Sequence, residues 1–335
     1  MKYNIVVILL FTVHLSVCQT IFSHERQIKN IENYISKEIG FYNSIDNIKI
    51  SGTLITPKSE YKKIIIIVPG SGKDTRNSHY KLTEEFLKNN IGVYRFDERG
   101  VGKSEGKFTK SIDHLSYDLA YAIMHLKSLL KLQEKKIGVL GHSFGGMTSI
   151  TSYKLISDSS VQIDFLIQIA SPVHNFSDAS RHQLKTLSKD QLKNKTVKDH
   201  IQLLDTLIYL IELNKNSTVN TISLRNKGID ILRRKGFKLN DIKFWSLMHI
   251  NLFQHNYEKI YTSLQIPTLY IIGEKDKYVN PTLEVSRLQK IKNPLITIKV
   301  MMGLDHYLTQ VSQSSKIYNI DTSATKTIMN WIEKI

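Results

Sequence analysis

The sequence predicts an α/β fold built on a mostly parallel sheet. Short runs rich in β-branched and other apolar residues alternate with helical patterns along the 335-residue chain, at residues 48–56, 64–68, 91–96, 137–140, 163–169, 268–272 and 295–300. The run at 64–68 is apolar throughout, as in a strand buried on both faces. Strands that alternate with helices form parallel sheets, and 41% hydrophobic residues can supply a sizeable core.

The helical patterns between these runs are amphipathic. Ser111 precedes a stripe in which apolar residues recur at three- and four-residue spacing, namely Ile112, Leu115, Leu119, Ile123, Leu126 and Leu130. Serine is a favoured N-cap because its side-chain oxygen can accept a hydrogen bond from a free backbone N–H of the first turn. We therefore expect a helix that begins after Ser111 and covers one face of the sheet.

The pattern changes between about residues 175 and 261, where no strand-like run occurs and helical patterns dominate. We expect an inserted helical lid at 175–261, as an excursion from a single core formed by residues 19–174 and 262–335. Apolar positions of this segment, such as Leu204, Ile208 and Ile211, are expected to cover a pocket. The alternative is that they face lipid, with the basic lid in weak contact with an anionic membrane surface.

The first 18 residues have the layout of a secretory signal peptide. Lys2 precedes a mostly apolar run at 5–17, and charged residues begin only after Gln19. A run of about 13 residues is shorter than the roughly 20 that a bilayer span requires. We expect cleavage near Cys18 and export to the periplasm or the exterior. A retained anchor, a buried helix or lipidation of Cys18, the single cysteine, are the alternatives.

The chain is strongly basic, with a formal net charge of +16. Such a surplus could attract nucleic acid, anionic lipid or acidic substrates. Lysine is abundant throughout, however, and no basic block interleaved with aromatic residues, typical of nucleic-acid modules, stands out. We therefore expect no nucleic-acid partner.

A candidate nucleophile lies between a predicted strand and a predicted helix, where residues 141–145 are Gly-His-Ser-Phe-Gly. A strand that turns sharply into a helix strains the backbone at Ser143, and a glycine two residues away on either side leaves room for that turn. The N–H of Phe144, at the helix N-terminus, is placed to stabilise an oxyanion. His142 is expected to pack against its surroundings, because neighbouring side chains on a tight turn diverge.

A serine hydroxyl is a weak nucleophile, so it requires an imidazole that takes its proton and a carboxylate that orients this imidazole. Asp276 follows the predicted strand at 268–272 and is our candidate for the acid, with Glu274 as the alternative. His306 follows the last predicted strand and is our candidate for the base. Ser143, Asp276 and His306 occur in the order serine, acid, histidine.

The loop after the strand at 64–68 is the expected source of a second oxyanion donor. Its sequence, Pro-Gly-Ser-Gly-Lys at 69–73, favours the N–H of Ser71, with Gly72 as the alternative. Lys73 gives the loop a superficial likeness to phosphate-binding loops, but the spacing of those loops is missing. The loop Asp-Glu-Arg-Gly-Val-Gly-Lys-Ser at 97–104 is interpreted as scaffold.

Together, these segments resemble the α/β-hydrolase superfamily, and especially its lid-bearing esterase branch. The likeness covers residues 48–335 and rests on the serine motif, the loops at 69–73 and 97–104, and Gly-x-x-Asp at 273–276. It implies an α/β-hydrolase fold with an eight-stranded, mostly parallel sheet, hydrolysis through an acyl-enzyme, the triad named above, and neither metal nor organic cofactor. Pro69 and Lys73 depart from the branch, which often has His and Pro at these positions, so the substrate stays open.

The sequence therefore predicts an exported serine hydrolase that cleaves carboxylic esters of small acyl compounds. A peptidase or thioesterase could use the same triad, because the pocket decides which leaving group is accepted. Export argues against coenzyme A thioesters as substrates. A hydrolase-fold binding protein without chemistry is the remaining alternative.

Overall fold

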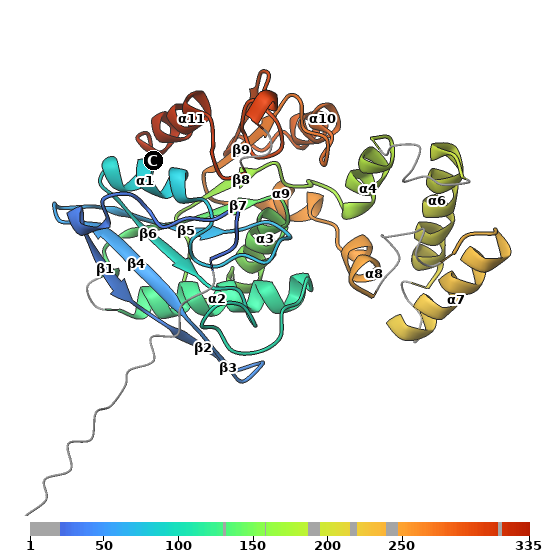
Figure 1. Ribbon diagram of the computed structural model, residues 1–335, viewed down its shortest axis with the longest axis horizontal. Helices are drawn as coiled ribbons and strands as arrows, with labels where there is room; N and C mark the ends of the chain where they lie inside the picture. The colour runs from blue at the N-terminus through green and yellow to red at the C-terminus, as the bar shows by residue number, and fades with distance from the viewer. Residues whose placement is uncertain are drawn as a thin grey trace, which may run out of the picture.

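The computed structural model describes residues 21–129, 132–157, 159–186, 195–214, 220–238, 247–313 and 317–335. A central sheet is enclosed by helices, and a separate group of helices extends to one side (Figure 1). The predicted signal peptide, with Cys18, lies outside the described residues.

The central sheet has eight strands in the order β1-β4-β6-β5-β7-β8-β9-β10. Strands β1 and β4 pair antiparallel to their neighbours, and the other pairs are parallel. The eight-stranded, mostly parallel sheet is thus confirmed. The strand bounds are Tyr34–Glu38 (β1), Gly52–Pro57 (β4), Lys63–Val68 (β5), Ile91–Phe96 (β6), Lys136–His142 (β7), Phe165–Ile169 (β8), Thr268–Gly273 (β9) and Ile296–Met301 (β10).

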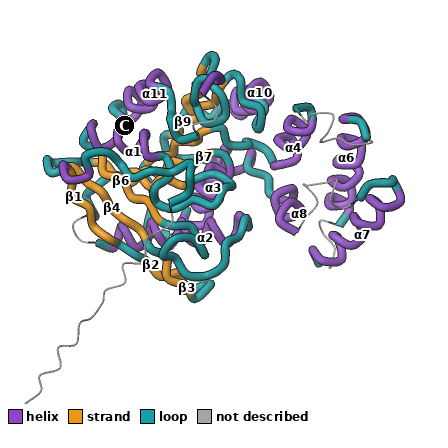
Figure 2. The backbone as a smooth tube through the Cα atoms, viewed as in Figure 1, coloured by secondary structure: helices purple, strands orange, loops and turns teal. Residues whose placement is uncertain are grey.

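Helices cover both faces of the sheet. Helices α1 and α11 lie against each other on one side, and α2 packs against α3 on the other, as the secondary-structure colouring of Figure 2 also shows. Short helix α9 lies between α3 and α10. The bounds are Tyr80–Lys88 (α1), Ile112–Ser128 (α2), Phe144–Ile156 (α3), Glu258–Ser263 (α9), Pro281–Ile291 (α10) and Thr322–Ile332 (α11), with short 3-10 helices at Ile31–Asn33 and Val311–Gln313.

Helix α2 follows the predicted stripe. Ile112, Leu119, Ile123 and Leu126 are fully buried, and Leu115 is partly buried against the same core. Ser111 occupies the N-cap position, but its side chain makes no capping hydrogen bond. The last residue of the predicted stripe, Leu130, lies outside the described residues.

The N-terminal part of the sheet differs from the prediction. The expected single strand at 48–56 is divided into β3 (Ile48–Ile50) and β4, and β3 pairs with β2 (Phe41–Asn43) in a separate two-stranded sheet. The division occurs at Ser51, whose N–H donates to Ser104 Oγ at 3.0 Å. Strand β1 was not predicted, because this edge strand is largely exposed and lacks a run of apolar residues.

The described residues of the predicted lid contain helices α4 (Phe176–Leu184), α6 (Val197–Leu213), α7 (Thr221–Arg234) and α8 (Leu247–Gln254), and no strand. Helix α6 contacts the other three and shares a hydrophobic cluster with them. Its members are Leu184, Leu203, Leu204, Leu207, Ile211, Leu224, Leu232, Phe237, Ile250 and Phe253. The lid helices thus have a hydrophobic cluster of their own, and the division into a core with an inserted lid stays a prediction.

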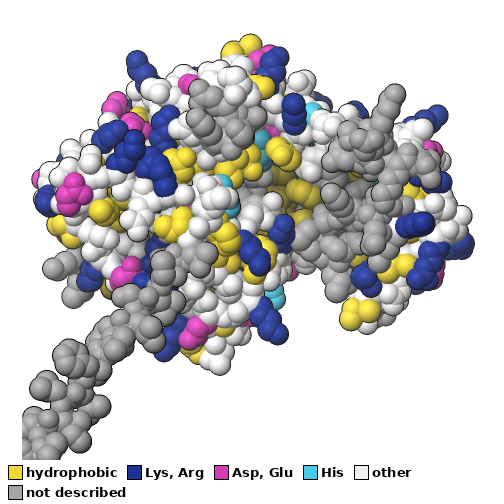
Figure 3. All heavy atoms as spheres, in the orientation of Figure 1, with side chains coloured by type: hydrophobic (Ala, Val, Ile, Leu, Met, Phe, Trp, Pro, Cys, Tyr) yellow, Lys and Arg dark blue, Asp and Glu magenta, His cyan; other side chains and the backbone are white. Residues whose placement is uncertain are grey.

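The same cluster corrects the expected orientation of the apolar lid residues. Leu204 and Ile211 are buried in the cluster, and Ile208 packs against it, so they face neither lipid nor a substrate pocket. A 3.6-residue period shows which residues share a helix face, but not which element covers that face. Among the described helices, none has the length and apolar character needed to cross a bilayer. Lys and Arg side chains stand on the exposed face of the lid in Figure 3, and weak contact of this face with a membrane stays a prediction.

The two chain crossings between core and lid lie side by side. The N–H of Tyr257 donates to the carbonyl oxygen of His174 at 2.8 Å, and the His174 imidazole lies 3.1 Å from the Glu258 carboxylate. Glu284 of α10 accepts a hydrogen bond from the N–H of Val173 at 2.8 Å through Oε2. Its Oε1 is buried without a partner, and burial raises the pKa of Glu284 to about 7.

We predict that Glu284→Gln stabilises the protein at alkaline pH. A carboxyl whose pKa is raised from 4.5 to about 7 on folding favours the folded state below pH 4.5, and this contribution is lost as the pH rises through 7. The amide cannot ionise and still offers an oxygen to Val173. Thermal unfolding should show a variant that is more stable than the wild type at pH 8, by up to about 3 kcal/mol, with a much smaller difference at pH 5.

Glu60→Gln, at an exposed position, is the matched control and should leave the pH dependence of stability unchanged. A Glu284→Gln effect of equal size at pH 5 and pH 8 would contradict the raised pKa.

Candidate active site

Ser143 occupies the turn between β7 and α3 with φ 54° and ψ −113°, a backbone conformation that non-glycine residues rarely adopt. The flanking glycines make this turn possible. A Cβ at position 141 would lie 2.4 Å from the carbonyl oxygen of Gly145, and one at position 145 would lie 2.2 Å from that of Pro69. The close approach of β5, β7 and α3 therefore excludes side chains at both positions and presents Ser143 at the end of the sheet.

Asp276 and His306 form a buried pair. His306 Nδ1 lies 2.7 Å from Asp276 Oδ2, with side-chain exposures of 7% and 0%. The other carboxylate oxygen accepts hydrogen bonds from the N–H groups of Tyr278 and Val279, at 2.7 and 2.9 Å. An imidazole that donates through Nδ1 to a carboxylate keeps Nε2 as its proton acceptor. The pair thus has the arrangement of a general base with its orienting acid.

The structure brings Asp276, and not Glu274, to His306. The Glu274 carboxylate accepts a hydrogen bond from the N–H of Gly303 at 3.0 Å and pairs with the neighbouring Lys275. Both acids follow β9 and contact the loop after β10, but Glu274 reaches Gly303 of that loop and Asp276 reaches His306. Tertiary contacts, which cannot be read from the sequence, distinguish the two candidate acids.

His142 links the loop of His306 to the nucleophile turn. Its Nε2 lies 3.1 Å from the carbonyl oxygen of His306, and the two ring centroids are 5.0 Å apart. Because a carbonyl only accepts, Nε2 carries the proton, and burial keeps the pKa of His142 well below its usual value. His142 is buried, as expected, but its bond to the base loop was missed. Among the hydrogen bonds of the described residues, none joins the Ser143 hydroxyl directly to His306.

The loop at 69–73, called the oxyanion loop below, lies beside Ser143. A Cβ at Gly70 would be 3.8 Å from Ser143 Cβ, so the loop backbone passes close to the nucleophile. Ser71 is exposed, and Phe144 is the first residue of helix α3. Backbone N–H groups of a helix N-terminus and a nearby loop are suited to stabilise negative charge. The N–H of Ser71 as the second donor, with Gly72 as the alternative, stays a prediction.

Buried ion pairs hold the loop at 97–104. Arg99 pairs with Asp118 and Asp46, at 2.6 and 2.7 Å, and Asp97 pairs with Arg76 at 3.0 Å. Removing one partner from such a pair leaves a buried charge uncompensated, which is strongly destabilising. The contacts agree with the interpretation of this loop as scaffold.

The lid contacts the loop that carries the acid. On α4, His182 Nε2 lies 3.0 Å from the carbonyl oxygen of Asp276, and Gln183 donates from Nε2 to the carbonyl oxygen of Tyr278 at 3.2 Å. Tyr278 is about half exposed, and its ring centroid lies 4.9 Å from that of His306. Helix α4 and Tyr278 therefore border the candidate site.

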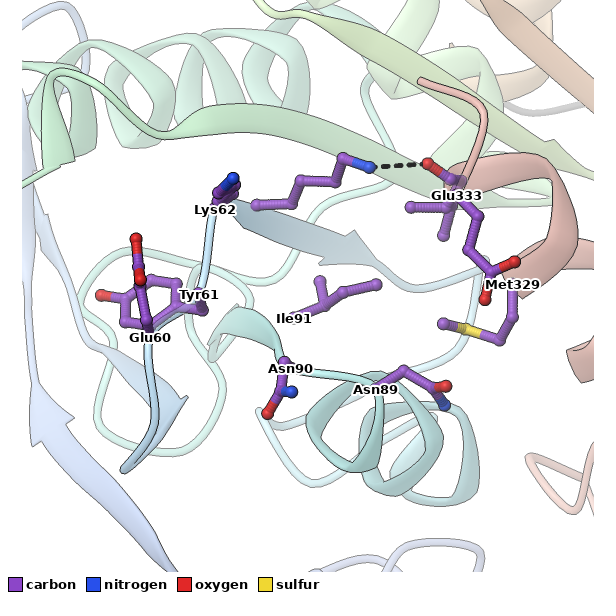
Figure 4. Close-up of a pocket in the computed structure, with 10 residues that line it drawn as sticks. Glu60, Tyr61, Lys62, Asn89, Asn90, Ile91, Met329 and Glu333 are labelled. Atoms are coloured by element: carbon purple, nitrogen blue, oxygen red, sulfur yellow. Dashed lines mark hydrogen bonds between the residues drawn. The ribbon is translucent and has the colours of Figure 1, made fainter.

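A cavity of about 330 Å³ lies at the other end of the strands, where β5 and β6 begin (Figure 4). Tyr61, Asn90, Ile91 and Met329 line it, and Lys63 Nζ donates to the carbonyl oxygen of Ile332 at 2.8 Å. Ligands of open α/β sheets bind outside the carboxyl ends of the strands. This cavity lies at the amino ends, so we do not assign it to the candidate site.

Solved structures with the same fold include two esterases and a further serine hydrolase. The esterase Pf2001 of Pyrococcus furiosus matches 94% of this chain and 97% of its own, with a TM-score of 0.60 and 18% identity. The esterase EaEST of Exiguobacterium antarcticum matches 88% and 98%, with a TM-score of 0.53 and 15% identity. An α-beta serine hydrolase homologue of Coxiella burnetii matches 88% and 96%, with a TM-score of 0.51 and 16% identity.

A comparison with curated protein sequences found no match. The family described as serine aminopeptidase, S33 (Hydrolase_4) matches residues 59–310, which include the nucleophile turn, the acid loop and the base loop. This range covers most of the chain and the three candidate residues in their expected order. The chain belongs to this family of the α/β-hydrolase superfamily.

Proposed function

We propose that the protein hydrolyses carboxylic esters of small acyl compounds through a covalent acyl-enzyme. The observation that carries the proposal is the buried Asp276–His306 pair. The loop of His306 is bonded through His142 to the turn that presents Ser143. Esterases among proteins of the same fold support the choice of substrate class.

In the proposed reaction, the Ser143 hydroxyl attacks the ester carbonyl carbon while His306 Nε2 takes its proton. The N–H groups of Phe144 and Ser71 stabilise the negative charge that develops on the carbonyl oxygen. His306 then protonates the leaving alcohol, which departs and leaves the acyl group on Ser143. Water, deprotonated by His306, attacks this acyl group and releases the acid. Asp276 orients His306 and stabilises its charged form throughout.

The first test replaces the nucleophile. We predict that Ser143→Ala lowers the turnover of p-nitrophenyl acetate and butyrate by about a thousandfold or more, because no covalent intermediate can form. Ser128→Ala, a hydroxyl deletion at the exposed last residue of α2, is the control and should retain most activity. Undiminished turnover in the purified Ser143→Ala protein would exclude Ser143 as nucleophile.

The second test separates the two acids. Asp276→Asn should lower kcat about 10³- to 10⁴-fold, because the amide no longer holds His306 in the proton-accepting tautomer. Glu274→Gln removes one negative charge two residues away and should leave kcat within about threefold, since surface charges contribute little. Equal losses in both variants would contradict the assignment of Asp276.

Aminopeptidase activity is the second candidate, favoured by the description of the family. It requires the same acyl chemistry with an amine as leaving group. Alanyl and prolyl p-nitroanilides, assayed with the wild type and Ser143→Ala, distinguish it from the esterase. Ser143-dependent release of nitroaniline that exceeds ester turnover would assign the chain to peptide substrates.

We also propose that the chain is exported through residues 1–18. The supporting pattern is the short apolar run after Lys2. Expression in a bacterial host should yield a periplasmic or extracellular protein whose N-terminus, determined by sequencing, follows Cys18. Deleting residues 2–17 should retain it in the cytoplasm, whereas radiolabelled fatty acid on Cys18 would identify a lipoprotein instead.

A further inference from the structure

The segment at 22–29, called the N-terminal strap below, is bonded to Asp74 and Thr75, the two residues that follow the oxyanion loop. Glu25 accepts two hydrogen bonds from Thr75, from its N–H at 2.6 Å and from its hydroxyl at 2.8 Å. Glu25 is 7% exposed and Thr75 only 1%, so both bonds lie in the interior. Hydrogen bonds to a charged group contribute more than neutral ones, and they are costly to leave unmade when buried.

His24 of the strap holds Asp74, the residue before Thr75. His24 Nε2 lies 2.9 Å from Asp74 Oδ1, and the Tyr318 hydroxyl donates to Asp74 Oδ2 at 2.8 Å. The N–H of Asp74 donates to Glu98 Oε2 at 2.9 Å. Asp74 is thus fixed by residues from the strap, the C-terminal part of the chain and the scaffold loop.

The strap is itself firmly attached. Arg26 makes two hydrogen bonds to the Glu84 carboxylate of α1, at 2.6 and 3.0 Å, and its guanidinium lies 4.0 Å from the centre of the Tyr80 ring. The N–H of Lys29 donates to the same carboxylate at 2.8 Å. A bidentate arginine pair has a defined geometry, so the strap is a fixed support.

The oxyanion loop is therefore held at both ends while its middle is exposed. At the first end, Pro69 packs closely against α3, because its carbonyl oxygen occupies the space that a side chain at Gly145 would need. At the other end are Asp74 and Thr75, and a Cβ at Gly72 would lie 3.3 Å from Asp74 Oδ2. An oxyanion donor must keep its position within a fraction of an ångström, so an exposed loop depends on its anchors.

We propose that Glu25 and His24 are positioning residues that hold the oxyanion loop in place for the stabilisation of negative charge beside Ser143. The inference rests on the proposed acyl chemistry, since it assigns the strap a role in that reaction. The strap touches neither Ser143 nor His306 through any hydrogen bond of the described residues; it acts through Asp74 and Thr75.

A divalent metal ion is the competing explanation for the same residues, because ligand atoms of His24, Glu25 and Asp74 lie within 4.8 Å of one another. The carboxylate oxygens of this group already accept hydrogen bonds from Thr75, His24 and Tyr318. A metal would have to displace those donors. The contacts therefore favour a hydrogen-bonded support.

The experiment compares Glu25→Ala, Glu25→Gln and the control Glu32→Ala in the full-length chain, with Ser143→Ala as the blank. Glu32 is exposed on the short helix that follows the strap. Two rates are measured for each protein, the hydrolysis of p-nitrophenyl butyrate and the labelling of Ser143 by a fluorophosphonate. Labelling forms a covalent bond at Ser143 and requires the same oxyanion donors, but it does not require the protein to be an esterase.

Glu25→Ala should lower kcat and the labelling rate by about tenfold or more with KM little changed, because the lost interaction acts in the transition state. Glu25→Gln should recover a large part of both rates, since its amide oxygen can accept from the N–H of Thr75. Glu32→Ala should match the wild type. Circular dichroism verifies that each variant is folded; if Glu25→Ala is not, the Gln variant and His24→Gln give the comparison.

Unchanged kcat and labelling in a folded Glu25→Ala protein, even with a lower melting temperature, would overturn the positioning role. Loss of wild-type activity on treatment with EDTA, restored by Zn²⁺, Mn²⁺ or Ca²⁺, would overturn it in favour of a metal site. A wild type that labels at Ser143 but cleaves no ester refutes the proposed substrate class, and the labelling rates still decide the inference. A wild type that neither labels at Ser143 nor cleaves an ester refutes both the proposed substrate class and the positioning role.

Discussion

The site depends on one constraint, the close approach of the backbones of β5, β7 and α3 around residues 141–145. Carbonyl oxygens of β5 and of α3 occupy the space that side chains at Gly141 and Gly145 would need. The sharp turn at Ser143 persists because packing on both sides determines it, and not because serine favours that conformation. The same contact places the end of β5, and thus the oxyanion loop, beside the nucleophile. One packing contact therefore fixes two parts of the candidate site.

The remaining parts are joined by hydrogen bonds between residues far apart in the sequence. His142 reaches the backbone of His306, and Asp276 reaches its imidazole. Tyr318, near the C-terminus, and His24, near the N-terminus, meet at Asp74. The sheet supplies the framework, because strands β5, β7, β9 and β10 end at the same edge. Loops that follow these ends are brought together whatever their separation along the chain.

The sequence predicts well what depends on local pattern. Apolar runs predict the buried parallel strands, and two glycines predict the turn at Ser143. What it could not show are contacts whose partners are distant: the exposed edge strand β1, the covered face of α6, and the bond from His142 to His306. The strap at 22–29 carries no motif at all. Glu25 and Thr75 are fifty residues apart, and only the fold reveals that they meet.

The two hydrogen bonds from α4 to the acid loop have a mechanical consequence. His182 and Gln183 bind the carbonyl oxygens of Asp276 and Tyr278, so α4 cannot move away as a rigid body without breaking both bonds. The chain crosses between core and lid where His174 meets Tyr257 and Glu258. The position of α4 and the support of the acid's loop are thus coupled. Any displacement wide enough to admit a bulky acyl group by way of α4 also withdraws two donors from the acid's own loop.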